Sequence, residues 1–174
     1  MMTEGFQTRI LVLQMGQDDP KKCTSAKLCR MKLAAPIPHA RRIPRDAIVL
    51  NPSVEEVFSL KDRPNLKHGL VAIDCSWKYA EQVFNRRFKG LNRRLPILLA
   101  GNPINYAKQG RLSSAEAVSA ALYIAGYIEH SKRIISLFKW GPTFLTLNHD
   151  PLEEYRLAET SEEVKKIEDE YFRP

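Results

Sequence analysis

The sequence lacks every pattern that would direct it into or across a membrane. No apolar run approaches the roughly 18 residues of a membrane-spanning helix, and residues 1–10 contain no apolar core of a signal peptide. Apolar residues make up 44% of the 174 residues, which is enough to bury one compact core. We therefore expect a soluble, cytoplasmic protein that makes no contact with a membrane.

Cysteine is scarce and is not grouped with other metal ligands. The three cysteines are an odd number that does not suit a disulfide framework, so we expect reduced thiols. Cys23 and Cys29 have no second cysteine pair or histidine nearby, which argues against a zinc site. The histidines are also isolated and fit surface positions better than catalytic ones: His39, His68, His130 and His149.

The motifs of familiar enzymes are absent as well. The chain has no Gly-x-Gly-x-x-Gly, P-loop, His-Glu-x-x-His or Gly-x-Ser-x-Gly sequence. A polar loop from Asn102 to Tyr106 follows an apolar run and is a candidate wall of a binding site, although ordinary turn chemistry explains it equally well.

Acidic residues are missing from one long stretch. Residues 21–45 hold eight lysines and arginines and no acid, and residues 86–94 hold five more. In a chain of formal net charge +7, such one-sided blocks predict a polyanionic partner, most simply the phosphates of RNA or DNA. A solvated basic face is the alternative.

An apolar run in the middle of the chain leads directly into polar and aromatic side chains. Residues 70–73 (Leu-Val-Ala-Ile) predict a buried parallel strand, and Asp74, Cys75, Ser76 and Trp77 follow it. Ligands of open α/β sheets bind beyond the carboxyl ends of strands, so Asp74 and Trp77 are candidate site residues. Alternatively, Asp74 caps the next helix and Trp77 packs in the core.

Strands and helices alternate over the first hundred residues, which predicts a parallel sheet covered on both faces. After residue 112 every predicted element is a helix, beginning with a capping box from Ser113 to Glu116. A short helix near residue 24 is expected to be capped by Thr24 or Ser25. The other expected elements are strands at 9–14, 47–50 and 95–100, helices at 53–60, 77–88 and 131–140, and an irregular stretch at 35–44.

Five ordered motifs carry a resemblance to a known family. They are residues 19–24 (Asp-Pro-Lys-Lys-Cys-Thr), 74–77 (Asp-Cys-Ser-Trp), 95–106 (Leu-Pro-Ile-Leu-Leu-Ala-Gly-Asn-Pro-Ile-Asn-Tyr), 112–117 (Leu-Ser-Ser-Ala-Glu-Ala) and 138–141 (Phe-Lys-Trp-Gly). The set resembles the small-subunit ribosomal RNA aminocarboxypropyltransferases, in their short archaeal form. The chain departs from the family at Gly101, where alanine is usual, and at Ala107, where glycine is usual.

The resemblance implies a fold similar to that of SPOUT-class methyltransferases. Residues 1–92 would form an α/β lobe with a parallel β-sheet and a basic N-terminal segment. Residues 93–174 would contain the cofactor loop and an all-helical C-terminal lobe, with a trefoil knot that departs from the usual rule against threaded loops. A monomer is expected.

The resemblance also implies the activity. The family transfers the 3-amino-3-carboxypropyl group of S-adenosylmethionine to N3 of a pseudouridine, in some cases N1-methylated, in small-subunit rRNA during ribosome biogenesis. Methylthioadenosine is released, no metal is used, and the partner is the rRNA or a pre-ribosomal particle. Family members hold the cofactor at positions that match Thr24, Ile73, Leu95, Gly110 and Ser114, with Asp74 and Trp77 facing its reacting end.

The chemistry of these residue types agrees with that activity. A carboxylate such as Asp74 can accept the proton of the pseudouridine nitrogen, and the ring of Trp77 can stabilise a sulfonium. The alternatives are a SPOUT-type S-adenosylmethionine-dependent RNA methyltransferase and a non-catalytic rRNA-binding assembly factor. Six basic residues are expected to bind rRNA: Lys21, Lys22, Lys27, Arg30, Arg93 and Arg94.

Overall fold

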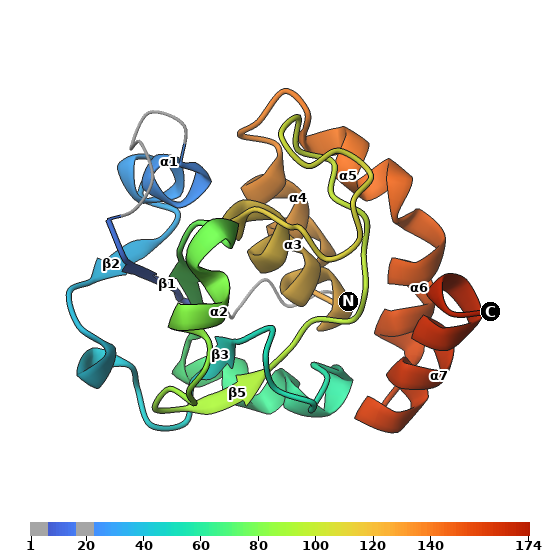
Figure 1. The fold of residues 1–174 in the computed structure, drawn as a ribbon, viewed down its shortest axis with the longest axis horizontal. Coiled ribbons are helices and arrows are strands. Elements are labelled where there is room, and N and C mark those ends of the chain that lie inside the picture. The colour runs from blue at the N-terminus through green and yellow to red at the C-terminus, as the bar shows by residue number, and fades with distance from the viewer. Residues whose placement is uncertain (1–6, 17–22) are drawn as a thin grey trace.

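Five parallel strands form one sheet in the computed structural model, which describes residues 7–16 and 23–174 (Figure 1). Their spatial order is β2-β1-β4-β3-β5, so β4 lies at the centre between β1 and β3. This confirms the predicted α/β class with a parallel sheet. The strands are β1 (Ile10–Gln14), β2 (Ala35–Ile37), β3 (Ile48–Leu50), β4 (Leu70–Asp74) and β5 (Leu91–Arg93).

The two faces of the sheet are buried in separate cores. Successive side chains of a strand point to opposite faces, so Leu70 and Ala72 of β4 enter one core, and Val71 and Ile73 enter the other. The larger core lies beneath the C-terminal helices. The smaller core lies beneath the 3-10 helix η1 (Ala40–Arg42) and the short helix α2 (Ala80–Val83). Burial on both faces explains why these strands are apolar without interruption.

Helices make up the last third of the chain, as predicted. They are α3 (Ser114–Ile124), α4 (Ile128–Ile135), α5 (Gly141–Leu147), α6 (His149–Leu157) and α7 (Ser161–Phe172). The capping box of Ser113 and Glu116 starts α3, and that of Thr160 and Glu163 starts α7. The larger core draws residues from both sides of residue 92, and the division of the chain there stays a prediction.

The predicted strand at residues 95–100 is wrong. This segment is extended but joins no sheet. Its backbone pairs with side chains of the C-terminal helices and, at residues 98–100, with the backbone of residues 107–110. Asn148 both accepts from Leu99 N at 2.7 Å and donates to Leu99 O at 2.8 Å, as a neighbouring strand would. Ile97 N donates to Glu168 at 2.8 Å, and Tyr155 donates to Ile97 O at 3.0 Å. The apolar pattern therefore identified a buried extended segment but not its partners.

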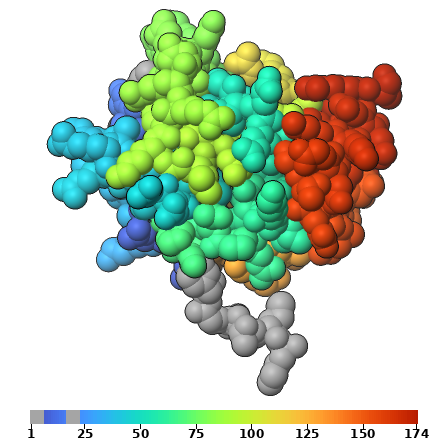
Figure 2. Space-filling view, turned by 90° about the horizontal axis from the view of Figure 1, so that it is seen from below, coloured from blue at the N-terminus to red at the C-terminus, as the bar shows by residue number. Residues whose placement is uncertain are grey.

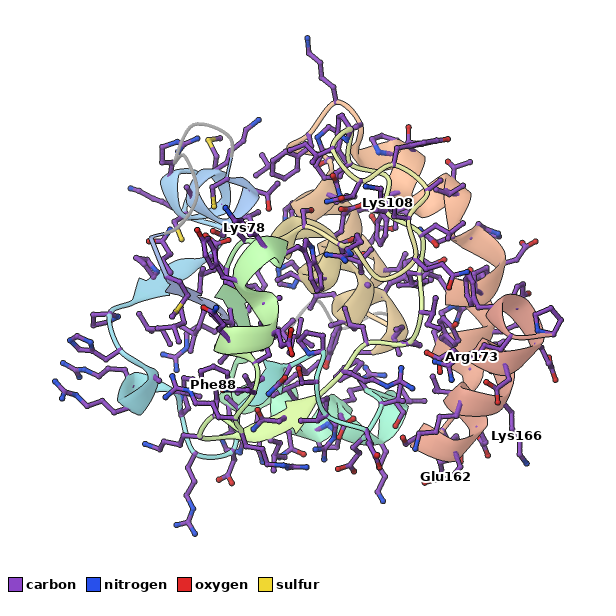
Figure 3. The ribbon with its side chains drawn as sticks, in the orientation of Figure 1. Lys78, Phe88, Lys108, Glu162, Lys166 and Arg173 are labelled. Atoms are coloured by element: carbon purple, nitrogen blue, oxygen red, sulfur yellow. The ribbon has the colours of Figure 1, made fainter. Side chains whose placement is uncertain are left out.

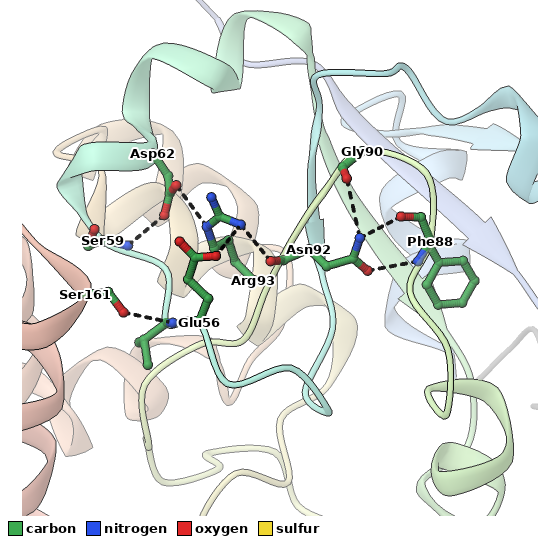
Figure 4. A network of polar contacts seen from close by, with 9 residues as sticks. Glu56, Ser59, Asp62, Phe88, Gly90, Asn92, Arg93 and Ser161 are labelled. Atoms are coloured by element: carbon green, nitrogen blue, oxygen red, sulfur yellow. Dashed lines mark hydrogen bonds and ion pairs between the residues drawn. The ribbon is translucent and has the colours of Figure 1, made fainter.

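Two other predictions, an irregular stretch and a short helix, also fail. Residues 35–44 were expected to be irregular, yet Ala35–Ile37 form the edge strand β2, where a proline is tolerated. Residues 53–60 form no helix. Instead Ser59 and Asp62 make a capping box for the 3-10 helix η2 (Leu60–His68), and Asp62 also accepts from Arg93 at 3.0 Å (Figure 4).

The helix predicted at residues 77–88 is much shorter in the structure. It consists of the 3-10 helix η3 (Trp77–Tyr79) and α2, and it ends at Phe84. The buried side chain of Asn92 then holds the backbone of Phe88, accepting from its N–H at 3.0 Å and donating to its carbonyl at 2.6 Å (Figure 4). These bonds stabilise an irregular turn in place of further helix.

The helices α6 and α7 form one flank of the molecule, opposite α1 (Thr24–Arg30) and β2 (Figure 1). Figure 2 shows them beside the segment that contains η2. Bonds from Val57 N to Ser161 and from Lys61 N to the carbonyl of Glu159 join the two regions. None of the described helices has both the length and the apolar character that crossing a membrane requires.

Candidate active site

One cleft of about 1050 Å³ lies at the carboxyl ends of β3 and β4. Ligand pockets span roughly 300–1000 Å³, so this cleft is large enough for a nucleoside-sized cofactor and part of a second substrate. Apolar groups form the larger part of its surface. Polar side chains come from the strand ends, from α1, from the loop after residue 101 and from the start of α3, and charged ones come from α7. Every predicted cofactor or catalytic position lines it: Thr24, Ile73, Leu95, Gly110, Ser114, Asp74 and Trp77.

The carboxylate of Asp74 is held by hydroxyl and thiol donors. Ser25 donates to Oδ2 at 2.7 Å, and Cys23 donates to the same oxygen at 2.8 Å. Ser114 donates to Oδ1 at 3.5 Å, which is a long and weak bond. Oδ2 is thus engaged by two donors, and Oδ1 is the more available oxygen of this carboxylate.

Asp74 does not cap the helix that follows it. Ser76 takes that role, because its hydroxyl accepts from Lys78 N at 3.3 Å. Trp77 is only partly buried and forms a wall of the cleft, with its indole Nε1 donating to Leu112 O at 3.1 Å. The alternative of a capping aspartate and a core tryptophan is therefore wrong.

The first turn of α1 joins the strand end to α3. Thr24 or Ser25 was predicted to cap α1, and this prediction is wrong. The N-cap is Cys23, and its side chain makes no capping hydrogen bond. Thr24 instead accepts from Ala115 N at 3.1 Å, and Ser25 bonds Asp74. Two residues that usually cap helices are used here to fix α1 against the site.

The thiol of Cys23 is kept in its neutral form beside Asp74. Burial raises its pKa above the ordinary 9.0, and the hydrogen bond to the Asp74 carboxylate raises it further. Because the thiolate is the reactive form of cysteine, this thiol is a poor nucleophile at neutral pH. Cys23 therefore acts as a hydrogen-bond donor to Asp74.

A buried carboxylate holds the loop on the opposite side of the cleft. Glu116 is fully buried at the start of α3 and accepts from Gly101 N at 2.6 Å and from Asn102 Nδ2 at 2.7 Å. Asn102 in turn accepts from Asn105 N at 3.0 Å. Several donors converge on one carboxylate, so the loop that follows Gly101 is fixed firmly to α3.

Two of the predicted RNA-binding arginines form ion pairs with carboxylates of the protein itself. Arg94 makes a bidentate pair with Glu168, which is 1% exposed, at 2.7 and 3.0 Å. Arg93 pairs with Asp62 at 3.0 Å and with Glu56 at 3.2 Å (Figure 4). These guanidinium groups position the cleft wall and α7, so we leave them out of the RNA-binding surface proposed below.

The other predicted RNA contacts lie on or near α1. Lys21 and Lys22 fall outside the described residues. Lys27 donates to Leu137 O at 2.7 Å and lies 5.0 Å from the centre of the Phe138 ring. Arg30 is exposed near the end of the same helix.

Sequence reasoning missed the residues that support the site. Ser25 resembled a helix cap and Glu116 resembled the third residue of a capping box, so local chemistry explained both. Glu168 is one of many charged residues of α7, and nothing in the neighbouring sequence indicates its pairing with the distant Arg94. The one available indication that Ser25 belongs to the site was its place next to Thr24, a predicted cofactor position.

The comparisons with known proteins agree with this geometry. A family model described as "Ribosome biogenesis protein, C-terminal" matches residues 48–172. A second model, described as a possible Fer4-like domain in RNase L inhibitor, matches residues 8–38. Ferredoxin-type clusters take four cysteine ligands, and this segment has only Cys23 and Cys29.

Whole-chain relatives are more specific. A 16S rRNA aminocarboxypropyltransferase of Methanosarcina mazei is 46% identical over 97% of this chain and 98% of its own. That of Methanopyrus kandleri is 45% identical over 93% and 97%. The solved structure of the SAM-dependent rRNA:acp-transferase Tsr3 from Vulcanisaeta distributa matches with a TM-score of 0.85 and 39% identity, over 91% of this chain and 88% of that one.

The fold and the cleft define an α/β protein with a large cleft at the carboxyl ends of its central strands. The match to whole-chain relatives over nearly the full length then identifies the family within that class. The chain belongs to the 16S rRNA aminocarboxypropyltransferase (Tsr3) family.

Proposed function

We propose that this protein transfers the 3-amino-3-carboxypropyl group of S-adenosylmethionine to 16S rRNA during ribosome biogenesis. The observation that carries the proposal is the single cleft that contains Asp74, Trp77 and all five cofactor positions of the family. Its volume and its largely apolar surface suit a nucleoside cofactor, and polar groups stand at the strand ends and at the starts of α1 and α3. The relatives of similar length with this activity support the same conclusion.

S-adenosylmethionine would supply a carbon activated by a sulfonium. The remaining work of the protein is to orient that carbon and to exclude water, and orientation alone can contribute several kcal/mol, so we propose that no metal is needed. Thr24, Ile73, Leu95, Gly110 and Ser114 would hold the cofactor.

Asp74 and Trp77 act at the reacting end of the cofactor in this proposal. N3 of the pseudouridine, whether or not N1 is methylated, forms the new bond to carbon while the sulfur–carbon bond breaks. The proton of N3 passes to Asp74 Oδ1, because Oδ2 already accepts from Ser25 and Cys23. The ring of Trp77 covers the sulfonium and its methyl group. The neutral product that leaves is methylthioadenosine.

Further parts of the proposal rest on family membership. The cofactor loop is threaded as a trefoil knot, the lobes divide near residue 92, and the protein acts as a cytoplasmic monomer. Small-subunit rRNA or a pre-ribosomal particle is the partner, with Lys21, Lys22, Lys27 and Arg30 contacting phosphates.

Product analysis tests the reaction type. Purified protein, S-adenosylmethionine and rRNA from a strain that lacks the gene should yield methylthioadenosine in amounts equal to the modified nucleoside. S-adenosylhomocysteine as the nucleoside product would instead indicate a methyltransferase. The absence of either product, together with RNA binding, would indicate a non-catalytic assembly factor.

A further inference from the structure

The loop of residues 102–111 exposes large apolar side chains at the mouth of the cleft. Ile104 is 78% exposed and Tyr106 is 58% exposed. Pro103, Ile104 and Asn105 also line the cleft, so this apolar surface begins at the site. Exposed apolar side chains next to a binding site are typical of a surface that is covered when a partner binds.

The 102–111 loop is held in one conformation. Ala107 N donates to Ala100 O at 2.7 Å, Ala100 N donates to Lys108 O at 3.0 Å, and Gly110 N donates to Leu98 O at 2.9 Å. The bonds that Gly101 N and Asn102 Nδ2 donate to Glu116 fix the base of the loop. Ala107 adopts a positive φ of 61°, a conformation unfavourable for a residue with a side chain, and these bonds maintain it. Tyr106 is therefore presented by a rigid turn.

The surroundings of the loop are basic. Lys108 and Arg111 are exposed, and residues 102–115 include no acid. The guanidinium of Arg111 lies 5.3 Å from the centre of the Trp77 ring, which links the loop directly to the site. Lys78, in the turn of Trp77, is also exposed. Figure 3 shows Lys78 and Lys108 on the upper side of the molecule, away from Glu162 and Lys166 of α7.

We propose that the 102–111 loop is a platform for unpaired rRNA bases beside the target nucleotide, with Tyr106 stacking on a base, Ile104 packing against it, and Lys108 and Arg111 contacting phosphates. This inference deepens the proposed function and rests on it. An aromatic ring flanked by cations is the combination that binds single-stranded nucleic acid. A surface with two cations and no acid suits a protein partner less well than it suits the phosphates of RNA.

The platform also explains how a base inside folded RNA reaches the cleft. A nucleotide that enters a pocket must leave its stack, and its former neighbours lose a stacking partner. A tyrosine ring at the rim can take that place. Specificity for RNA with an open structure around the target follows from this arrangement.

The test uses the full chain and a fluorescent single-stranded RNA that carries the pseudouridine and its natural flanks. Loss of one base stack should weaken RNA binding of Tyr106→Ala by about 10-fold. Tyr106→Phe keeps the ring and should bind within about twofold of the wild type. Leu157→Ala is the matched control for Ile104→Ala, because Leu157 is 69% exposed on α6, away from the cleft. Cofactor affinity, measured by calorimetry, should be unchanged in both Tyr106 variants and in Leu157→Ala.

The outcomes separate the platform from the reaction. If the wild type transfers the group but Tyr106→Ala and Ile104→Ala bind and modify RNA as Leu157→Ala does, the platform is refuted and the reaction stands. If RNA binding depends on the Tyr106 ring while the wild type transfers no aminocarboxypropyl group, the platform stands and the proposed reaction fails. Equal loss with Tyr106→Phe would also refute stacking.

Discussion

At the scale of single residues, the site depends on the way in which Asp74 is held. The sequence placed this carboxylate at a strand end, and the family resemblance gave it a role. Neither could show that Ser25 and Cys23 occupy one of its oxygens, because those residues lie 49 and 51 positions away. Such contacts depend on the packing of α1 against β4, which local sequence does not encode.

The variant Asp74→Asn tests the role of the free oxygen. The amide oxygen of asparagine can still accept from Ser25 and Cys23, but the amide nitrogen cannot take a proton. If Asp74 is the proton acceptor, turnover should fall by roughly 10²-fold or more while cofactor affinity changes little. Single-turnover rates over a range of pH provide the measurement, and a wild-type rate at every pH would contradict the role.

The variant Ser25→Ala is the companion to Asp74→Asn. It removes one of the two donors to Oδ2 and keeps the carboxylate, so turnover should fall less than in Asp74→Asn. A variant that loses only stability, with unchanged turnover per folded molecule, would show that Ser25 has no part in orienting Asp74.

At the scale of elements, the structure shows what each of the two departures from the family does locally. Gly101 packs against α5, and an added Cβ would lie 2.7 Å from Phe144 Cα. Ala107 occupies a left-handed turn in which glycine is favoured, so its usual family residue would relieve strain. The sequence identified both positions as departures from the family but could not show which neighbour each one faces.

The variant Gly101→Ala should therefore be destabilised. Overpacking of this kind costs about 1–3 kcal/mol, because the backbone of α5 must shift away. Ala107→Gly is the control in the same loop and should be neutral or slightly stabilised. Urea unfolding of both variants provides the comparison, and equal stability of Gly101→Ala and wild type would show that the Phe144 contact relaxes at no cost.

Pairing between distant elements explains the main error in the predicted fold. Residues 95–100 have the composition of a buried strand, and burial was predicted correctly. Asn148, Tyr155 and Glu168 supply several of the hydrogen bonds that a strand would have supplied, and the backbone of residues 107–110 supplies others. The pattern of apolar residues predicts which side chains are buried. It does not identify the hydrogen-bond partner of a backbone group.

At the scale of the whole molecule, Glu168 fastens the C-terminal helices to the wall of the cleft. Burial raises its pKa, but hydrogen bonds from Arg94 and Ile97 outweigh burial, so the pKa lies below the ordinary 4.5. A carboxyl whose pKa is lower in the folded state stabilises the fold above its ordinary pKa and loses that contribution as the pH falls through the folded value. Part of the acid sensitivity below pH 4.5 should come from this group.

The variant Glu168→Gln should be less stable than wild type by about 3 kcal/mol at neutral pH, because Arg94 loses its buried partner. Its stability should also change less than that of the wild type between pH 5 and pH 3. Glu162→Gln, at an exposed position of α7, is the control and should follow the wild type. Parallel acid-dependence curves for Glu168→Gln and wild type would contradict the assignment.

The proposed activity of the whole molecule depends on which carbon of S-adenosylmethionine is transferred to the RNA. Two samples of S-adenosylmethionine, one labelled in the methyl group and one in the carboxyl group, are incubated with the protein and unmodified rRNA. Only the carboxyl label should enter the RNA, because the proposed reaction brings the aminocarboxypropyl carbon to the nucleotide. Methyl label in the RNA would contradict it.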